Sequence, residues 1–523
     1  MKARDLLLAF LAGAMAMSRP CVAQTQSRFR FEQSPGMYAV GLKVVNQYDT
    51  SRTWGPAVDE MGKPTEGARP RPLQTVVWYP AMKGAGTAMT VGDYAKLLET
   101  ETSFDKPGLA GQWQSWMTGM APAMKDSLWA VRDATAAAGK FPIVVYTPSF
   151  GVMSWENADL CEYLASHGYL VLAAGALGAT TRSMTSDLAG INAQARDVSF
   201  LVGYALSLPN VEPTEVAVAG FSWGGIANLF AAARDRRISA LVALDGSMRY
   251  YPGLVKDAGD VHPERMTIPL LFFTQGGMTM EDTNRFLTKP ENSGTNVLNA
   301  WTHGDLELVR MLGMAHPEFS SMNQRNEHTW DEWGLMQPGD YTREDGVPSF
   351  AWVARYTLAF LDGYLKHDAA SLAWLKKSGA ENIVPPHLLA ARFREGSGMP
   401  ATADAFRLEL GRRGFENIEA VYAEFHKQHP EFKLEEDKTD DWGNELKDKG
   451  HPQEAIAVFK LNTTLFPESG NTWYSLGDAY ASTGDKTRAI ESFRKTAGMD
   501  FEFAAESKKK LEALEKEQAG AKQ

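Results

Sequence analysis

A serine between two glycines, at residues 220–224 (GFSWG), is the feature of this sequence with the clearest chemical meaning. It follows the apolar run Val216–Ala219 and precedes Gly225–Ala231, which predicts a helix. Glycines let the chain turn so sharply between strand and helix that Ser222 stands clear of the sheet, at the positive end of the helix. Because glycine is common here (46 of 523 residues) and tight turns also use it, the pentapeptide alone fits a structural turn as well.

A candidate acid and a candidate base follow this serine. The β-rich run Ile238–Leu244 ends at Asp245, and the apolar run Leu306–Met314 ends just before His316. A neutral imidazole can remove the proton of Ser222, and a buried carboxylate can fix the imidazole tautomer. Singly, the aspartate fits a turn residue before glycine, and the histidine a surface residue before proline. The order serine, acid, base is that of α/β-hydrolases, so together the three predict acyl-transfer chemistry.

Four segments resemble the platelet-activating factor acetylhydrolases and the wider dienelactone hydrolase-like group. They are residues 147–168 (TPSFGVMSWENADLCEYLASHG), 220–225 (GFSWGG), 240–246 (ALVALDG) and 315–320 (AHPEFS). The resemblance spans roughly Tyr38 to His367. It implies that Ser222 is the nucleophile, Asp245 the acid and His316 the base. Dienelactone hydrolases themselves use cysteine, so a serine disfavours their specific substrate.

The resemblance also implies an oxyanion hole made by the backbone N–H groups of Phe150 and Trp223. The physical reason is that attack on a carbonyl places negative charge on its oxygen, which fixed N–H donors stabilise. One donor follows the nucleophile, and the other lies in the loop after the third strand. Phe141–Thr147 predicts that strand and Pro148–Met153 that loop. A loop aromatic that only packs is the alternative for Phe150, and the family often has His-Gly where this chain has Pro148-Ser149.

The N-terminus predicts a secretory signal peptide over residues 1–23. Lys2 and Arg4 precede the apolar run Leu6–Met17, which is too short for a stable membrane span. Small residues at 21–23 offer a cleavage site before Gln24. We therefore expect a periplasmic or secreted protein. No later segment has an uncharged apolar run of spanning length, so no membrane span is expected.

Composition limits the remaining classes. A length of 523 residues predicts more than one domain, and the formal net charge of −11 argues against a nucleic-acid partner. No zinc-like cysteine cluster, EF-hand-like loop or phosphate loop is present, so no metal or cofactor is implied. After cleavage only Cys161 would remain, which excludes an intrachain disulfide and predicts a buried, unreactive thiol.

Alternating strands and helices predict the α/β-hydrolase fold over residues 24–383, with a mostly parallel sheet and helices on both faces. The expected strands are Met37–Val45, Gln74–Tyr79, Ile143–Thr147, Tyr169–Ala174, Val216–Ala219, Ile238–Leu244, Leu270–Thr274 and Leu306–Met314. Ala193–Ser207 is expected as a helix before the serine turn, and Ser349–His367 as the closing helix.

An insertion of about residues 82–140 interrupts this alternation. Its aromatic and methionine side chains suit a lid over an apolar acyl group, and they equally suit packing of the insertion onto the domain. They are Trp113, Trp116, Met117, Met120, Met124 and Trp129.

The C-terminal part has a different organisation, with matched residues 34 positions apart. The pairs are Gly443/Gly477, Gly450/Gly484, Ala455/Ala489 and Phe459/Phe493. This period resembles the tetratricopeptide repeat, a helix–turn–helix unit. We expect such repeats over residues 436–523, after a helical connector at 384–435.

The sequence as a whole predicts a secreted serine hydrolase with a C-terminal repeat module. The expected reaction is cleavage of a small-molecule carboxylic ester with an apolar acyl or alcohol part, through an acyl-serine. An amide or peptide-bond hydrolase is the nearest alternative because the triad chemistry is shared. A non-catalytic binding or scaffold protein that acts through its repeats is the alternative from a different class. The repeats are expected to bind a protein partner or a second copy of the chain.

Overall fold

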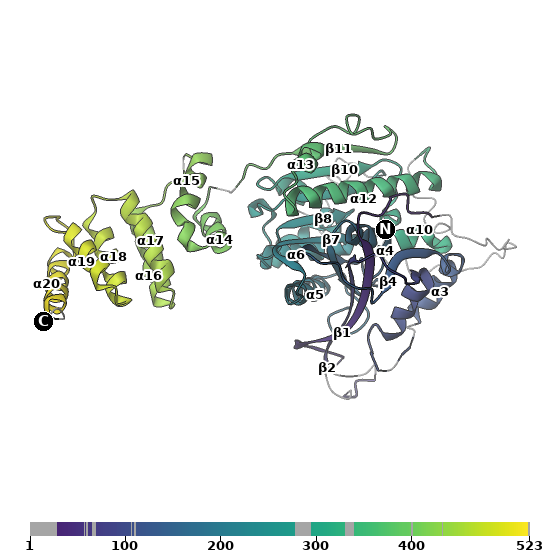
Figure 1. Ribbon diagram of the computed structural model, residues 1–523, viewed down its shortest axis with the longest axis horizontal. Helices are drawn as coiled ribbons and strands as arrows, with labels where there is room; N and C mark the ends of the chain where they lie inside the picture. Colours follow the sequence, from purple (N-terminus) through teal and green to yellow (C-terminus); the bar gives the residue numbers. More distant parts are fainter. Residues whose placement is uncertain are drawn as a thin grey trace.

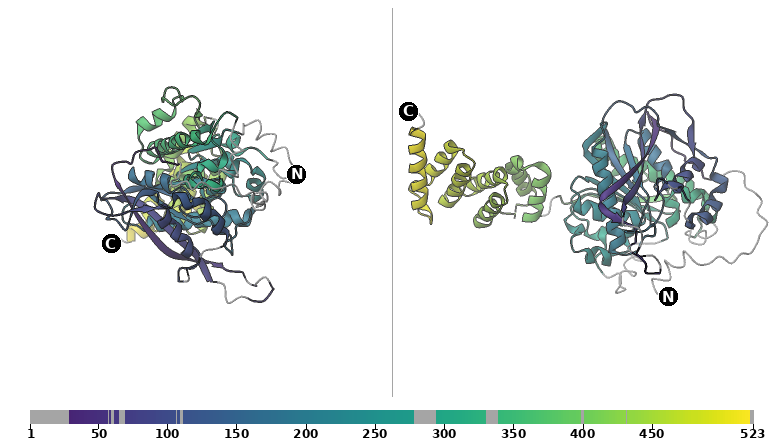
Figure 2. Two further views of the ribbon diagram at one scale, coloured as in Figure 1. Left: turned by 90° about the vertical axis from the view of Figure 1, so that its right-hand side faces the viewer. Right: turned by 90° about the horizontal axis from the view of Figure 1, so that it is seen from below.

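A large α/β body and an elongated array of helices make up the computed structural model (Figure 1). The structure describes residues 29–520 apart from 57, 59–60, 65–68, 106, 109–110, 278–293, 330–338, 399–400 and 431. The expected signal peptide lies outside the described residues. The helical array extends away from the body in each view that shows it from the side (Figures 1 and 2).

An eleven-stranded sheet forms the centre of the α/β body, in the order β11-β10-β9-β8-β7-β5-β6-β2-β1-β4-β3. The strands are β1 Ala39–Trp54, β2 Arg69–Ala81, β3 Ala88–Thr90, β4 Ser127–Arg132, β5 Phe141–Thr147, β6 Leu170–Ala174, β7 Val211–Phe221, β8 Ala240–Leu244, β9 Leu270–Gln275, β10 Leu306–Met311 and β11 Leu389–Arg394. The run from β10 to β6 is parallel. The α/β-hydrolase fold expected from the sequence is thus confirmed.

Helices cover both faces of the sheet because its central strands are apolar on both sides. On β5, Ile143 and Val145 pack with helices α5 (Leu188–Leu206) and α6 (Trp223–Arg234). Val144 and Tyr146 of the same strand pack with α4 (Ala158–Ser166) and α12 (Arg343–Leu365) on the opposite face. The shorter α helices of the body are α2 Val91–Ala95, α3 Gln112–Met120, α7 Pro252–Ala258, α9 Val297–Ala300, α10 Ser321–Arg325 and α13 Ala369–Leu375.

One expected boundary is wrong. Residues 384–435 were expected to be a helical connector, but β11 lies in this range and pairs antiparallel with β10, from Leu306 opposite Arg394 to Met311 opposite Leu389. The sheet therefore ends on a strand that comes after the expected domain boundary. The preceding strand is also shorter than expected, since β10 ends at Met311 rather than Met314.

The insertion at 82–140 extends the opposite edge of the sheet. Its strand β4 pairs in parallel with β1, with Val40 opposite Ala130, and β3 pairs with β4. Trp113 and Met120 are buried in the main core, and the other four aromatic and methionine side chains pack against that core. For these side chains the structure thus favours the packing alternative over the lid.

The C-terminal region is all-helical. Its helices are α14 Ala403–Arg413, α15 Ile418–Gln428, α16 Glu436–Asp448, α17 Pro452–Leu465, α18 Gly470–Ser482, α19 Lys486–Lys495 and α20 Ala504–Gly520. The pair α16–α17 and the pair α18–α19 begin 34 residues apart at both helices. Gly443 lies against the ring of Phe459, and Gly477 lies against the ring of Phe493. Equivalent small and aromatic residues therefore make equivalent interhelical contacts.

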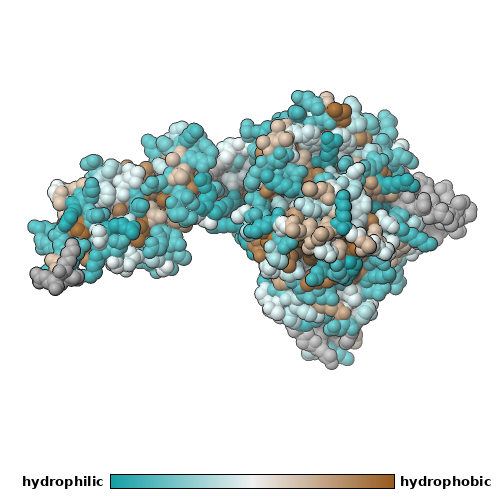
Figure 3. Space-filling model, in the orientation of Figure 1, coloured by the Kyte–Doolittle hydropathy of each residue, from teal (hydrophilic) through white to brown (hydrophobic). Residues whose placement is uncertain are grey.

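Among the described helices, none is both long enough and apolar enough to cross a bilayer. The face in Figure 3 is mainly hydrophilic over both regions, with apolar residues in small groups. Cys161 is buried on α4, and burial raises the pKa of its thiol well above the usual range. That environment fits the unreactive thiol expected from the sequence.

Candidate active site

Ser222 lies on a sharp turn between β7, which ends at Phe221, and α6, which begins at Trp223. Its backbone has φ 52° and ψ −116°, a region that non-glycine residues rarely adopt. A Cβ on Gly220 would lie 2.8 Å from the carbonyl carbon of Gly224 and 2.6 Å from the side-chain nitrogen of Asn228. The first glycine is therefore required by close approach, which distinguishes this turn from an ordinary one.

A continuous hydrogen-bonded chain links the three residues that the sequence predicted as nucleophile, base and acid. His316 Nε2 lies 2.9 Å from Ser222 Oγ, and His316 Nδ1 lies 2.6 Å from Asp245 Oδ2. The Asp245 side chain is fully buried and that of His316 is 24% exposed. An acid that accepts from Nδ1 leaves Nε2 unprotonated, so that it can accept the serine proton.

The sheet explains why these three residues meet. β7, β8, β9 and β10 run in parallel, so their carboxyl ends lie along one edge. Asp245 follows β8, and His316 begins the short 3-10 helix His316–Phe319 after β10. His303 precedes β10, at the opposite end of that strand, and its Nδ1 lies 2.8 Å from Ser397 Oγ. The structure thus brings His316 to the serine and leaves His303 away from it.

The loop after β5 lies beside the serine turn, because Thr147 pairs with Gly220 at the ends of their strands. Phe150 and Trp223 are neighbours there, with ring centroids 5.5 Å apart in an edge-to-face arrangement. Within the described part of the chain, neither backbone N–H of these two residues donates to a protein acceptor. Two such donors, one on the loop beside the serine turn and one on the residue after Ser222, are available to stabilise an oxyanion.

Aromatic side chains surround the serine. Trp223 contacts Tyr251 edge-to-face at 5.7 Å between centroids, and the Phe221 ring lies 4.9 Å from the His316 ring. Phe150 remains 36% exposed, which is unusual for a large apolar residue in this chain. Phe221 and Trp223 are themselves buried, so the exposed Phe150 and the half-buried Tyr251 offer apolar surface to a substrate.

Several residues that support the site had no signal in the sequence. Tyr250 donates its hydroxyl to Asp245 Oδ1 at 2.9 Å, and burial raises the pKa of the tyrosine, so that it stays a neutral donor. Arg182 donates to the carbonyl of Gly151 at 3.0 Å and forms an ion pair with Glu101 at 2.6 Å, which links the insertion to the loop after β5. The contacts of Arg182 are recognisable only once separate segments are placed together, whereas the bond of Tyr250 to Asp245, five residues away, depends on the path of the turn between them.

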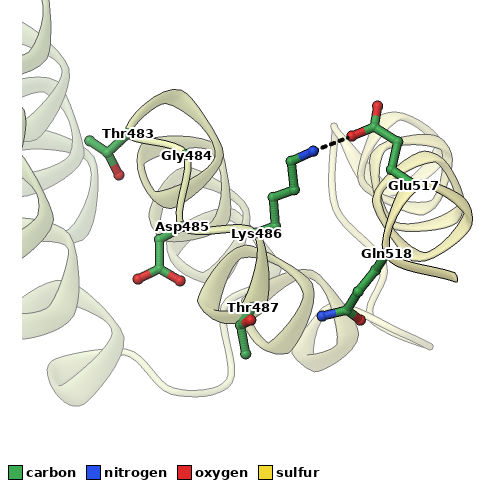
Figure 4. Close-up of a pocket in the computed structure, with 7 residues that line it drawn as sticks. All are labelled: Thr483, Gly484, Asp485, Lys486, Thr487, Glu517 and Gln518. Carbon is green, nitrogen blue, oxygen red and sulfur yellow. Dashed lines mark hydrogen bonds and ion pairs between the residues drawn. The ribbon is translucent and has the colours of Figure 1, made fainter. Parts of the chain in front are cut away.

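A second hollow is lined by side chains that form no comparable catalytic arrangement. It lies in the helical region, between the α18–α19 turn and α20 (Figure 4). Lys486 crosses it to form an ion pair with Glu517 at 2.7 Å. No group of three or more His, Cys, Asp or Glu among the described residues is placed to hold a metal ion.

The fold, the strained serine turn and the hydrogen-bonded chain together define the class of α/β-hydrolases. Residues 130–275 match the model of the dienelactone hydrolase family, so this segment of the body is similar to that family. The matched segment contains Ser222 and Asp245 but ends before His316. This match supports a hydrolase that acts on esters.

Among solved structures, the chain is similar to a ferulic acid esterase from Streptomyces cinnamoneus. The identity is 20% and the TM-score 0.48, over 71% of this chain and 100% of the esterase chain. A search of curated proteins found no match.

Proposed function

We propose that the protein is a serine hydrolase that cleaves a carboxylic ester through an acyl-serine intermediate. The observation that carries this proposal is the chain Asp245–His316–Ser222, with hydrogen bonds of 2.6 and 2.9 Å and the serine on a strained strand-to-helix turn. A histidine that is hydrogen-bonded to both a buried carboxylate and a serine hydroxyl has no evident structural task and is arranged for proton transfer.

In the proposed reaction, Ser222 Oγ attacks the carbonyl carbon while His316 Nε2 takes the hydroxyl proton. The carbonyl π electrons move to oxygen, where the N–H groups of Phe150 and Trp223 stabilise the charge. Collapse of this intermediate expels the alcohol, which takes the proton from His316. A water molecule then attacks the acyl-serine by the same route and releases the carboxylic acid.

The expected substrate is a small ester with an apolar acyl or alcohol part. Support comes from the ring of Phe150, 36% exposed beside the nucleophile, and from its packing on Trp223. An amide or peptide bond remains the alternative because it would use the same residues. A series of aryl esters of increasing chain length, compared with the matching anilides, distinguishes the two.

Labelling of the nucleophile tests the mechanism. A fluorophosphonate probe is expected to label the native protein at Ser222 and to leave Ser222→Ala unlabelled. Equal labelling of both proteins would sink the assignment. Absence of both labelling and ester turnover in the native protein would favour the binding or scaffold alternative.

The proposed location is the periplasm or the external medium, because residues 1–23 have the composition of a secretory leader. N-terminal sequencing of the protein purified from its own cells is expected to begin at Gln24. A mature protein that retains Met1 would contradict this. The helical region is proposed to be a tetratricopeptide-like module that binds a protein or a second copy of the chain.

A further inference from the structure

The loop that carries the Phe150 N–H, residues 148–153, is hydrogen-bonded to a buried carboxylate, that of Glu156. Glu156 is 1% exposed, at the start of the segment that leads into α4. It accepts the backbone N–H of Ser149 at Oε2 over 2.9 Å and the hydroxyl of Ser149 at Oε1 over 2.5 Å. Tyr146 donates its hydroxyl to Oε2 at 3.3 Å. Both carboxylate oxygens are thus used, and two of the three donors belong to one residue of the loop.

The two hydrogen bonds from Ser149 to Glu156 help to determine the direction of the next backbone N–H, which is that of Phe150. The carbonyl of Ser149 accepts from the N–H of Val152 at 3.2 Å, so the peptide between Ser149 and Phe150 is held on its oxygen side. A trans peptide is planar, so the Phe150 N–H must point away from that carbonyl. Glu156 fixes the nitrogen and the side chain of Ser149 and the Val152 N–H fixes its carbonyl, so together they set the plane of the peptide that follows.

Glu156 and its neighbour Asn157 also bind the segment that follows His316. The main-chain carbonyl of Glu156 accepts from Ser320 Oγ at 3.0 Å and from the N–H of Met322 at 3.3 Å. The neighbouring Asn157 accepts the N–H of Ser321 at 2.7 Å and donates to the carbonyl of Phe319 at 2.9 Å. Glu156 and Asn157 therefore bind both the loop that carries the Phe150 N–H and the segment that follows His316.

We propose that Glu156 is a positioning residue of this active site, which holds the Phe150 N–H in the oxyanion hole by binding Ser149 through two hydrogen bonds. It acts through Ser149 and touches no reacting atom. Ser149 supplies both the backbone N–H and the hydroxyl that the carboxylate binds. The proposal rests on the proposed function, because it assumes that an oxyanion forms at Ser222.

The experiment compares Glu156→Leu and Glu156→Gln with the native protein, on an aryl ester, with kcat expressed per site titrated by a fluorophosphonate. The oxyanion forms in the transition state and the tetrahedral intermediate but not in the bound ester, so a misplaced donor lowers kcat and leaves KM unchanged. Losing one donor costs about 10²–10³-fold in kcat in other enzymes, so we expect Glu156→Leu to lose about 10–100-fold. The conservative Gln keeps an acceptor for the Ser149 N–H and is expected to recover most of that loss.

Glu162→Leu is the matched control. Glu162 is also 1% exposed and lies on α4, but its partners are the hydroxyl of Tyr94 and the N–H groups of Trp129 and Ala130. This variant is expected to lower Tm while kcat per site stays native. A kcat per site that is native in Glu156→Leu, or equally lowered in Glu162→Leu, would overturn the proposal.

Ser149→Ala decides the question if Glu156→Leu does not fold. It removes one of the two hydrogen bonds and keeps the backbone N–H, so a smaller fall in kcat at constant KM is expected, and an unchanged kcat would overturn the proposal. Failure of the proposed function looks different, because the native protein itself would then show no labelling at Ser222 and no turnover.

Discussion

The two regions of this chain are held together in opposite ways. In the α/β body the proposed acid, base and nucleophile are Asp245, His316 and Ser222, and each follows a different parallel strand of one mixed sheet. In the helical region the equivalent contacts, Gly443 with Phe459 and Gly477 with Phe493, join neighbouring helices of one pair. A site built from distant segments requires the whole sheet, whereas a repeat requires only its neighbours.

Removing the proposed base should have the largest effect, and it tests whether the active site depends on residues from distant segments of the chain. His316→Ala is expected to lower kcat on an aryl ester by about 10⁴-fold or more, because triad members act as a unit. His303→Ala should leave kcat unchanged, since His303 lies at the other end of β10 and binds Ser397. Steady-state kinetics of both variants measure this, and the reverse pattern would show that the wrong histidine has been assigned.

Truncation tests whether the two regions are separable. A chain that ends after Val384 lacks β11 and exposes the edge of β10 along its full paired length, so we expect misfolding or aggregation. A chain that ends after Gly398 keeps β11 and the bond from Ser397 to Thr302, and is expected to keep native kcat/KM on small esters. Thermal unfolding and ester kinetics of both truncations distinguish them. Loss of activity in a well-folded 398 truncation would mean that the helices help to form the active site.

A substitution in the repeat should affect stability alone. A Cβ at Gly443 would overlap the buried ring of Phe459, so Gly443→Val is expected to destabilise the helical region by about 1–3 kcal/mol. Glu445→Val, two positions along the same helix and exposed, controls for the helix propensity of valine. Calorimetry should show the loss in the first variant only, with native kcat in both. A parallel loss of kcat would contradict the independence of the regions.

The smallest expected effect concerns a buried carboxyl in the sheet. Glu307 on β10 is 1% exposed, and burial raises its pKa from 4.5 to about 8. Between these values the folded state keeps a proton that the unfolded state has lost, so the free energy of unfolding falls as the pH rises. Glu307→Gln removes this dependence and is expected to add about 1–2 kcal/mol of stability at pH 8, with no gain near pH 4.

Urea unfolding of Glu307→Gln and the native protein across this pH range provides the measurement. Glu512→Gln, an exposed change on α20, serves as the control. A gain that is equal at pH 4 and pH 8 would show that ionisation of Glu307 is not its cause.

Much of the body could be predicted from the sequence. Strands such as β5 and β8 are continuous apolar runs because both of their faces are buried, and such runs stand out in a sequence. β11 (LAARFR) escaped prediction because it lies at the sheet edge, where one side is open and the apolar run is broken by arginine. Its assignment as a strand depends on its pairing with β10.

The sequence by itself determined which residues could form the active site and where the repeat begins, because both follow from patterns of residue type and spacing. A glycine-flanked serine, the order of acid and base after strand-like runs, and a period of 34 residues need no knowledge of the fold. Only the tertiary structure decided how the site is supported. The contacts of Arg182 with Glu101 and Gly151 and of Asn157 with Ser321 depend on strand register and loop paths that bring separate segments together. Since hydrogen bonds form only within about 3 Å, such partners follow from geometry and leave no spacing rule in the chain.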